Sequence, residues 1–400
     1  MNKNKNALTK KKNINLCVIY SNAHQNVKKT ANFTASLAKN YFETSTYEIL
    51  PNVKKQYILT SMKILYHIIR RKVKILILVE PWYPILILLF LRGSKTKLIY
   101  RSGNINFDVF RSLKFNFLLT NILKLIEIQI IKRSDIIFSD AESMINYFSR
   151  YNKNRAIYYV PESIREKTSY YKGEIKSNTI SGTDSISFLK VGYISTIHTE
   201  SLGNRILPRG WELIEICKKL LEADIQEFEI LIIGKGSGFY NLNAMVKERN
   251  FTKYFKFTGY VSDDDKIELL SHVDIGFCED YKSYMTHRFN LSSKIQEYLN
   301  VGVPVVTGNQ GDKRIVIGNS ENPCGICIEA LDDKNQDDFE RYINDLSKAI
   351  IYLRNHATVL SKMKENCLSE FSRRFSRRSI ELTIDKVFKE LYHQEIEDAT

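Results

Sequence analysis

Short apolar runs of strand length alternate with helical patterns along the first half of the chain. These runs occupy residues 13–20, 73–79, 97–101, 135–138 and 156–160. Most of them are continuous rather than alternating, which is typical of strands that are buried on both faces. The pattern predicts a parallel sheet that is covered by helices on both sides.

The second half repeats this alternation after a polar, patternless stretch at residues 162–186. Its strand-like runs occupy residues 187–194, 228–238, 255–261, 274–278, 303–306 and 325–330, and a helical pattern covers residues 336–392. Ligands of such sheets bind beyond the carboxyl ends of the strands. We therefore expect the loops after residues 194, 234, 261, 278 and 307 to converge on one site.

These patterns predict an α/β protein with two Rossmann-like, doubly wound domains that face a cleft. The predicted parts are a basic disordered arm at 1–12, an N-terminal domain at 13–170, a linker at 171–186, a C-terminal domain at 187–375 and a helix at 376–400. We expect this last helix to pack back toward the N-terminal domain. A chain of 400 residues can bury more than one sizeable core.

The basic residues are concentrated in the first half of the chain. The whole sequence has a formal net charge of +14. Residues 1–180 contain 31 Lys and Arg against 11 Asp and Glu, a net charge of +20, and the remainder carries −6. This asymmetry suggests an anionic partner. No nucleic-acid-binding module is recognisable, whereas basic amphipathic segments at 58–72 and 110–133 suit an anionic membrane surface; a solvated basic surface is the alternative.

The sequence predicts no segment that spans a membrane. The longest apolar region, residues 75–91, is interrupted by Glu80, Pro81 and Pro84, which favours a strand followed by a helix. The first residues are basic and polar, unlike a signal peptide. Six scattered cysteines without a secretion signal indicate a reducing compartment. We expect a cytoplasmic protein that lies peripherally on the inner face of the cell membrane.

Two motifs were considered as metal sites. Cys324 and Cys327 form a single CxxC without a second pair or a nearby histidine cluster, which favours structural thiols. The acidic run Asp263, Asp264 and Asp265 stands at a predicted helix start, where carboxylates complement the helix dipole. We assign no metal ligand.

Residues 288–307 combine a helix start, two opposite charges and a return to a strand. Ser292 or Ser293 can cap the helix. Lys294 and Glu297 are three residues apart, so they lie on one helix face near its positive N-terminus. A nucleotide diphosphate suits this geometry, because the cation can meet phosphate oxygens while the carboxylate accepts hydrogen bonds from the ribose. The alternative is a solvated ion pair between the two side chains.

The motifs of the second half, taken in order, resemble the nucleotide-binding half of GT-B glycosyltransferases of the large retaining family 4. The segments are VGYI at 191, PRGWELIEICKKL at 208, LIIGKGSG at 231, FTGYVSDDDKIELLSHVDIGF at 257 and SSKIQEYLNVGVPVV at 292. RSDIIFSDAESMINYFSRY at 133 also resembles a unit late in the family's first domain. The resemblance implies the GT-B fold and sugar transfer. RFNLSSK before the acidic helix resembles a branch involved in surface polysaccharide assembly.

The resemblance implies roles for three charged residues. Glu297 matches the second glutamate of the family's paired motif, which is implied to hold the ribose. Arg209 stands where the family usually has lysine, and Lys294 lies in the acidic-helix segment. Both are implied to stabilise the negative charge that grows on the donor diphosphate as the sugar departs.

Other donor-binding candidates lie in loops. Gly234 and Gly236, with Gly238, would let the backbone approach the nucleotide, although loop closure alone is equally consistent with them. Tyr260 and Val261 match the strand end that usually offers backbone atoms to the base.

The chain also departs from the family pattern. Phe289 stands where the first glutamate of the pair is expected, and Tyr193 replaces a usual arginine. Asn290 could partly substitute for the missing glutamate, and Glu279 or Asp280 could supply an acid from the same loop.

Two histidines are candidates on the acceptor side. His24 lies in the first loop of the N-terminal domain, and His198 follows the first strand of the C-terminal domain. A surface position is the alternative for each of them.

The sequence thus predicts a metal-independent, retaining hexosyltransferase without a cofactor. It would move a sugar from a UDP- or GDP-linked donor to a lipid-linked oligosaccharide in surface polysaccharide synthesis, such as lipopolysaccharide or capsule. The alternatives are a non-catalytic GT-B-like protein that binds nucleotide sugar or a partner transferase, and a GT-B enzyme that isomerises nucleotide sugars.

Overall fold

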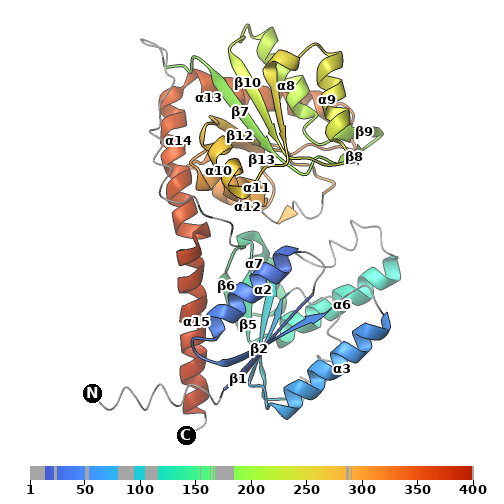
Figure 1. Ribbon diagram of the computed structural model, residues 1–400, viewed down its shortest axis with the longest axis vertical. Helices are drawn as coiled ribbons and strands as arrows, with labels where there is room; N and C mark the ends of the chain where they lie inside the picture. Colours follow the sequence, from blue (N-terminus) through green and yellow to red (C-terminus); the bar gives the residue numbers. More distant parts are fainter. Residues whose placement is uncertain are drawn as a thin grey trace, which may run out of the picture. The chain divides into compact units, whose positions relative to one another are not determined.

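The chain forms two compact units, each with its own sheet (Figure 1). One unit comprises residues 1–163 and 377–400, and the other comprises residues 164–376. The computed structural model describes residues 14–21, 25–49, 54–79, 94–103, 116–153, 155–162, 164, 166, 184–284, 288–289 and 291–398. Both sheets have six parallel strands, which confirms the predicted fold class of two doubly wound α/β units.

The sheet of the first unit has the strand order β2-β1-β3-β4-β5-β6. Its central strand β3 is buried along its whole length, as the apolar sequence ILILV predicts. The strands are β1 (Asn15–Ser21), β2 (Glu43–Ile49), β3 (Ile75–Val79), β4 (Lys97–Ser102), β5 (Ile136–Ser139) and β6 (Ala156–Tyr159).

The helices of the first unit cover both faces of this sheet (Figure 1). They are α2 (Gln25–Ala38), α3 (Lys54–Arg70), α6 (Phe117–Arg133), α7 (Glu142–Tyr151) and α15 (Arg377–Glu397). The C-terminal helix α15 places Ile384 and Phe388 in the same hydrophobic core as β1 and α2. In addition, the Tyr41 hydroxyl donates a hydrogen bond of 2.7 Å to Asp385. The end of the chain therefore completes the first unit.

The sheet of the second unit has the strand order β11-β10-β7-β12-β13-β14. Its strands are β7 (Leu189–Ile194), β10 (Phe228–Ile233), β11 (Phe255–Gly259), β12 (Ile275–Cys278), β13 (Val305–Gly308) and β14 (Gly325–Ile328). A separate antiparallel pair is formed by β8 (Thr199–Leu202) and β9 (Arg205–Pro208). The central strands β7 and β12 end side by side, so the segments that follow them meet at one edge of the sheet.

Helices pack on both faces of the second sheet. They are α8 (Glu212–Glu222), α9 (Phe239–Glu248), α10 (Asp263–Ser271), α11 (Ser293–Asn300), α12 (Asp312–Val316), α13 (Asp338–Asn355) and α14 (Ala357–Glu370), with a 3₁₀ turn at Thr252–Tyr254 and a π-helical turn at Phe371–Phe375. Among the residues that the structure describes, no helix combines the length and the apolar character needed to cross a bilayer.

Two elements differ from the sequence-based prediction. Strand β2 was not recognised, because its sequence ETSTYEI is polar and the strand lies at the edge of the sheet. The hairpin β8–β9 was also missed; Arg205–Pro208 forms β9, and α8 begins at Glu212. This hairpin brings Glu200 beside Arg209, a contact that the linear pattern does not reveal.

Candidate donor-binding site

Helix α11 is fixed against the carboxyl edge of the second sheet by Tyr298. The Tyr298 hydroxyl donates toward the carbonyl oxygens of Gly192, at 2.9 Å, and Phe277, at 3.2 Å, and accepts from the Ile194 amide at 3.2 Å. The ring needs the glycine on β12, since a Cβ atom at Gly276 would lie 2.7 Å from it. The N-terminal end of α11 is thereby held beside the ends of β7 and β12.

Lys294, in the first turn of α11, lies against Glu279, which directly follows β12. Lys294 Nζ is 2.5 Å from Glu279 Oε1, and the Glu279 side chain is 2% exposed. The ammonium group also lies 5.0 Å from the centre of the buried Tyr193 ring. Burial acts to raise the pKa of Glu279, but the charges of Lys294 and Arg209 outweigh it and hold that pKa below its usual value. Glu279 is therefore a carboxylate that is ionised under the influence of two cations.

Arg209 is the second of these cations. It follows β9, and its backbone amide donates to the carbonyl oxygen of His198 at 2.8 Å. Its guanidinium binds the Glu200 carboxylate from the neighbouring strand β8. Burial acts to lower the pKa of Arg209, but the carboxylates of Glu279 and Glu200 raise it above its usual range. Arg209 is thus a permanent positive charge with a quarter of its side chain exposed.

The site also contains a buried carboxylic acid, Glu212, that the sequence analysis did not identify. Glu212, at the start of α8, is fully buried and accepts a hydrogen bond from the Tyr281 hydroxyl. Burial and the nearby charge of Glu279 raise the pKa of Glu212 to about 8. Nothing in the sequence marks this residue, because a glutamate in the first turn of a helix is ordinarily solvated.

Glu297 lies one turn after Lys294 on α11, but it forms an ion pair with Lys266 rather than with Lys294. Its Oε1 atom is 3.0 Å from Lys266 Nζ on α10, and Lys266 is also 3.1 Å from Asp263. Burial raises the pKa of Glu297, and Lys266 partly offsets this. Lys294 and Glu297 thus have separate partners, and the alternative of a solvated ion pair between them is wrong.

The second carboxylate oxygen of Glu297 is buried and lacks a hydrogen-bond partner among the residues that the structure describes. A buried acceptor without a donor is unfavourable by about 1–3 kcal/mol, so such an atom is a position where a ligand hydroxyl can bind with gain.

Asp280 does not share the position of its neighbour Glu279. Its carboxylate is completely buried and lies 2.5 Å from Lys313 Nζ, and the Gln310 side-chain amide donates to it at 2.8 Å. The Gly308 position must lack a side chain, since a Cβ atom there would lie 2.4 Å from Asp280. In this arrangement Glu279, rather than Asp280, is the acid that pairs with Lys294 and feels the charge of Arg209.

The loop that carries Glu279 and Asp280 is tied to the loop after β14. The Leu331 amide donates to the Asp280 carbonyl at 3.0 Å, and the Lys282 amide donates to the Leu331 carbonyl at 2.8 Å. This double contact extends the sheet edge by a parallel bridge between Tyr281 and Leu331.

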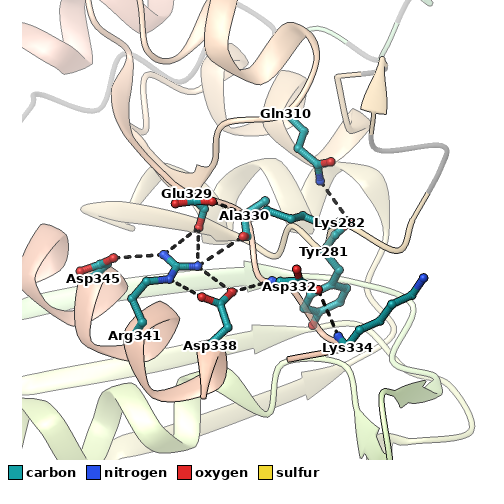
Figure 2. Close-up of polar contacts among 10 residues, drawn as sticks. All are labelled: Tyr281, Lys282, Gln310, Glu329, Ala330, Asp332, Lys334, Asp338, Arg341 and Asp345. Carbon is teal, nitrogen blue, oxygen red and sulfur yellow. Dashed lines mark hydrogen bonds and ion pairs between the residues drawn. The ribbon is translucent and has the colours of Figure 1, made fainter. Parts of the chain in front are cut away.

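Arg341 on α13 holds this second loop in place. Figure 2 shows its guanidinium donating to the carboxylates of Asp338 and Asp345 and to the carbonyl oxygens of Glu329 and Ala330. The distances lie between 2.5 and 3.4 Å. Arg341 therefore holds the loop after β14, and this loop in turn holds the backbone next to Glu279.

The glycines after β10 allow the backbone of their loop to lie directly against the backbone that follows β7. Gly234 has a φ of +133°, and a Cβ atom there would lie 1.9 Å from the Ser195 carbonyl oxygen. At Gly236 the corresponding distance to the Ile197 carbonyl oxygen is 2.4 Å. The loop therefore requires glycine for its own packing, and a contact with nucleotide is not needed to explain these residues.

Of the five remaining candidates, the structure describes Tyr260, Val261 and His198. Tyr260, after β11, is 85% exposed, and Val261 beside it is half-buried. His198 is exposed, and its Nδ1 atom is 3.4 Å from the Ser237 hydroxyl in the glycine loop. His24 and Asn290 lie outside the described residues.

The acidic run at the start of α10 forms a helix cap. The Ser262 hydroxyl accepts from the Asp265 amide at 3.2 Å and donates to its carboxylate at 2.7 Å, while Asp263 pairs with Lys266. These contacts agree with the interpretation of the acids as complements of the helix dipole.

The two parallel, doubly wound units have the fold that is known from GT-B glycosyltransferases. Sucrose-phosphate synthase from Thermosynechococcus elongatus has the same fold, with a TM-score of 0.63 at 11% identity over 95% of this chain and 100% of that one. HepE from Anabaena, solved in complex with UDP-glucose, matches with a TM-score of 0.59 at 11% identity over 94% and 99%. A glycosyltransferase from Rickettsia africae matches with a TM-score of 0.57 at 13% identity over 94% and 98%.

The second unit also contains a region that is similar to a known family. Residues 211–357, all in this unit, match the family model described as glycosyl transferases group 1. The match includes Glu212, Glu279, Lys294 and Glu297 and begins two residues after Arg209. A comparison with the curated proteins found no match.

Proposed function

We propose that this protein is a retaining, metal-independent hexosyltransferase that moves a sugar from a UDP- or GDP-linked donor to a lipid-linked glycan. The reaction breaks the bond between the anomeric carbon and the diphosphate oxygen and forms a bond from the same carbon to an acceptor hydroxyl, whose proton is released. The product belongs to a cell-surface polysaccharide, such as lipopolysaccharide or capsule, and the enzyme works peripherally at the inner face of the cell membrane.

The observation that carries this proposal is the pair of cations, Lys294 and Arg209, on either side of the buried Glu279. Negative charge grows on the diphosphate as the sugar departs. Fixed cations in a largely dry site stabilise that charge without having to reorganise, which is commonly the largest contribution to catalysis. The positive N-terminal end of α11 adds to the same field.

Glu297 supports a nucleotide as the donor. Its buried Oε2 atom is available to a ribose hydroxyl, while Lys266 holds Oε1. Tyr260 and Val261 lie at the end of β11, and we assign this strand end to the base together with the backbone of Gly234 and Gly236. HepE from Anabaena, which has this fold, was solved in complex with UDP-glucose, and we extend that donor class to this chain.

We assign acceptor binding from the positive charge of residues 1–180 and from the positions of His24 and His198 in the sequence. The net charge of +20 over residues 1–180 suits an anionic membrane in which a lipid-linked oligosaccharide is carried. His24 and Asn290 keep their sequence-based assignments to the acceptor and the donor. His198, beside the glycine loop, is proposed to contact the acceptor.

The rival proposal is a non-catalytic protein that binds a nucleotide sugar or a partner transferase. It is favoured by Phe289, which stands in place of the first glutamate of the family's pair. Its backbone carbonyl accepts from the Asp312 amide at 3.1 Å, so the position has a structural use without an acidic side chain.

Nucleotide release from UDP- and GDP-sugars in the presence of membranes separates the two proposals. A transferase releases nucleoside diphosphate in proportion to the sugar incorporated into glycolipid, and Arg209→Ala and Glu297→Ala lower both. Arg249→Ala is the matched control, because this arginine makes an ion pair with Glu215 on an exposed surface. Undiminished transfer in Arg209→Ala and Glu297→Ala would mean that the donor site lies elsewhere, and binding without release would favour the rival.

A further inference from the structure

Among the residues that the structure describes, the first unit exposes an apolar and basic surface on α3 and α6. We propose that this surface, formed by α3 and α6 and called the α3/α6 face, binds an anionic lipid bilayer, with lipid phosphate entering a lysine-lined hollow at its end. This inference rests on the peripheral membrane location proposed above and assigns it to particular residues. It does not depend on the donor site.

The apolar part of the α3/α6 face consists of two stripes at helical spacing. On α3 the exposed fractions are 58% for Met62, 63% for Tyr66 and 54% for Ile69. On α6 the corresponding stripe contains Phe117, Leu118, Ile122 and Leu125, which are between 44% and 83% exposed. Positions i, i+4 and i+7 lie on one side of a helix, so each helix has a continuous outer apolar stripe in addition to its buried one.

Both stripes belong to the same side of the sheet. The connections β2-α3-β3 and β4-α6-β5 run in the same direction across the strand order, and β1-α2-β2 runs in the opposite direction. Because such crossovers are right-handed, α3 and α6 cover one face of the sheet and α2 covers the other. Figure 1 agrees, with α3 and α6 on one side of the first unit and α2 and α15 on the other.

The hollow lies where the two helices end. It has a volume of about 520 Å³ and is lined by Ile68, Ile69, Lys72, Val73, Lys74, Ser94, Lys95 and Thr96. Ile69 thus belongs both to the hollow and to the stripe on α3. At the end of α6, Arg133 donates to the carbonyl oxygens of Ser94, at 3.2 Å, and Thr96, at 3.4 Å, so α6 reaches the same rim.

The charge around the stripes is predominantly positive, although Arg71 makes an ion pair with the exposed Glu43 at the start of β2. Lys63, Arg70, Arg71, Lys72, Lys74, Lys95 and Lys132 are exposed on these helices and on the rim of the hollow. Among the described residues of α3, α6 and the hollow the sole acidic residue is Glu127, which is 3% exposed.

This combination favours a lipid surface over a protein partner. Apolar side chains surrounded by lysine and arginine suit the boundary between acyl chains and anionic headgroups, where the apolar atoms insert and the cations meet phosphate. A tyrosine such as Tyr66 also prefers this boundary. The hollow lies beside the amino ends of β3 and β4, opposite the carboxyl edge, so membrane contact would leave the carboxyl edge of this sheet free.

Sedimentation of the full-length protein with vesicles tests the inference. We expect binding to phosphatidylcholine vesicles that contain phosphatidylglycerol, weak binding to phosphatidylcholine alone, and loss of binding as salt is raised. Nucleotide release from donor sugar in the absence of vesicles is measured on the same preparations. If that release is intact and vesicle binding is absent, the present inference fails while the donor site stands.

The variants locate the contact. Leu125→Asp, and separately Lys72→Glu combined with Lys74→Glu, are expected to lower partition onto the anionic vesicles roughly tenfold or more. The matched controls lie on α15: Leu382→Asp, where the leucine is as exposed as Leu125, and Lys386→Glu combined with Lys389→Glu. Circular dichroism of every variant confirms that it is folded.

Three outcomes would overturn the inference. The first is an equal loss of binding in the α15 controls, because binding would then depend on net charge rather than on the α3/α6 face. The second is equal binding to neutral and anionic vesicles. The third is the absence of vesicle binding together with a dimer that Leu125→Asp dissociates in sedimentation velocity, which would make the face an interface between two copies.

Discussion

Lys294 and Glu279 form a nearly dry ion pair, with 2.5 Å between Nζ and Oε1, although fifteen residues separate them in the sequence. The pair joins the first turn of α11 to the end of β12, so the cation that we assign to the donor diphosphate is already oriented before the donor arrives. A diphosphate would have to share Lys294 with Glu279, and Arg209 supplies additional positive charge for this exchange.

Replacement of Lys294 by methionine should lower activity and stability together. The loss of one fixed cation typically raises the barrier by about 2.7–4 kcal/mol. The unpaired buried carboxylate of Glu279 should destabilise the fold by roughly 3 kcal/mol. The measurements are kcat and unfolding in urea.

The double variant Lys294→Met with Glu279→Gln separates these two effects. We expect it to recover most of the stability, because no buried charge is left unpaired, while kcat stays low. Recovery of kcat together with stability would show that Lys294 serves Glu279 and not the donor.

The Glu297 Oε2 atom, which has no hydrogen-bond partner among the described residues, predicts a preference for ribonucleotides. In the wild-type protein the removal of the 2′-hydroxyl from the nucleoside diphosphate should weaken binding by about 1.5–3 kcal/mol, as for a hydrogen bond to a charged group. In Glu297→Ala the two nucleotides should bind almost equally. Calorimetric titration measures all four affinities, and a discrimination that persists in the variant would place the ribose elsewhere.

Glu212 predicts a pH dependence of stability. Its pKa is about 8 in the folded protein, well above that of an ordinary glutamate, so the folded state binds this proton more tightly than the unfolded state does. Its stabilising contribution is therefore complete below the unfolded pKa and is lost as the pH rises through about 8. Glu212→Gln does not titrate and can still accept from Tyr281.

We therefore expect the stability of Glu212→Gln relative to wild type to increase by about 1.4 kcal/mol between about pH 7 and pH 9. Urea unfolding at several pH values measures this difference. A pH-independent difference would mean that Glu212 is already ionised in the folded protein at neutral pH.

Tyr298→Phe should loosen the attachment of α11 while leaving its ring in place. The variant removes one hydroxyl and leaves the Gly192 and Phe277 carbonyls without this donor, at a cost of about 1–3 kcal/mol. Because α11 carries Lys294, donor affinity should fall as well. Tyr240→Phe, at a position that is 71% exposed, is the control and should change neither quantity.

Phe388→Ala tests the role of α15 in the first unit. The side chain is fully buried beside β1 and α2, so we expect a destabilisation of about 3–5 kcal/mol. Hydrogen exchange should become faster in β1 and α2 and remain slow in β7. Leu382→Ala, an exposed position on the same helix, should leave both regions unchanged. Equal acceleration in β7 would mean that the two units unfold together.

Most of the fold was predictable from the sequence, because a strand buried on both faces must be apolar along its whole length. Strand β3 is an example, with ILILV buried at every position. The end of α11 before Gly302, which has a φ of +75°, likewise follows from local rules of backbone conformation. Ser292 stands at the N-cap of α11, but its side chain makes no capping hydrogen bond. Strand β2 escaped notice because an edge strand can remain polar.

The sequence by itself determined the order of the elements, the fold class of two doubly wound units and the helix that carries Lys294 and Glu297, since these depend on periodicity, turns and motifs. The tertiary structure alone decided which charges meet. It paired Lys294 with Glu279 and Glu297 with Lys266, buried Glu212 under Tyr281, and enclosed Asp280 with Lys313. Electrostatic partners are set by distance and burial, and neither quantity is encoded in the spacing of residues along one chain.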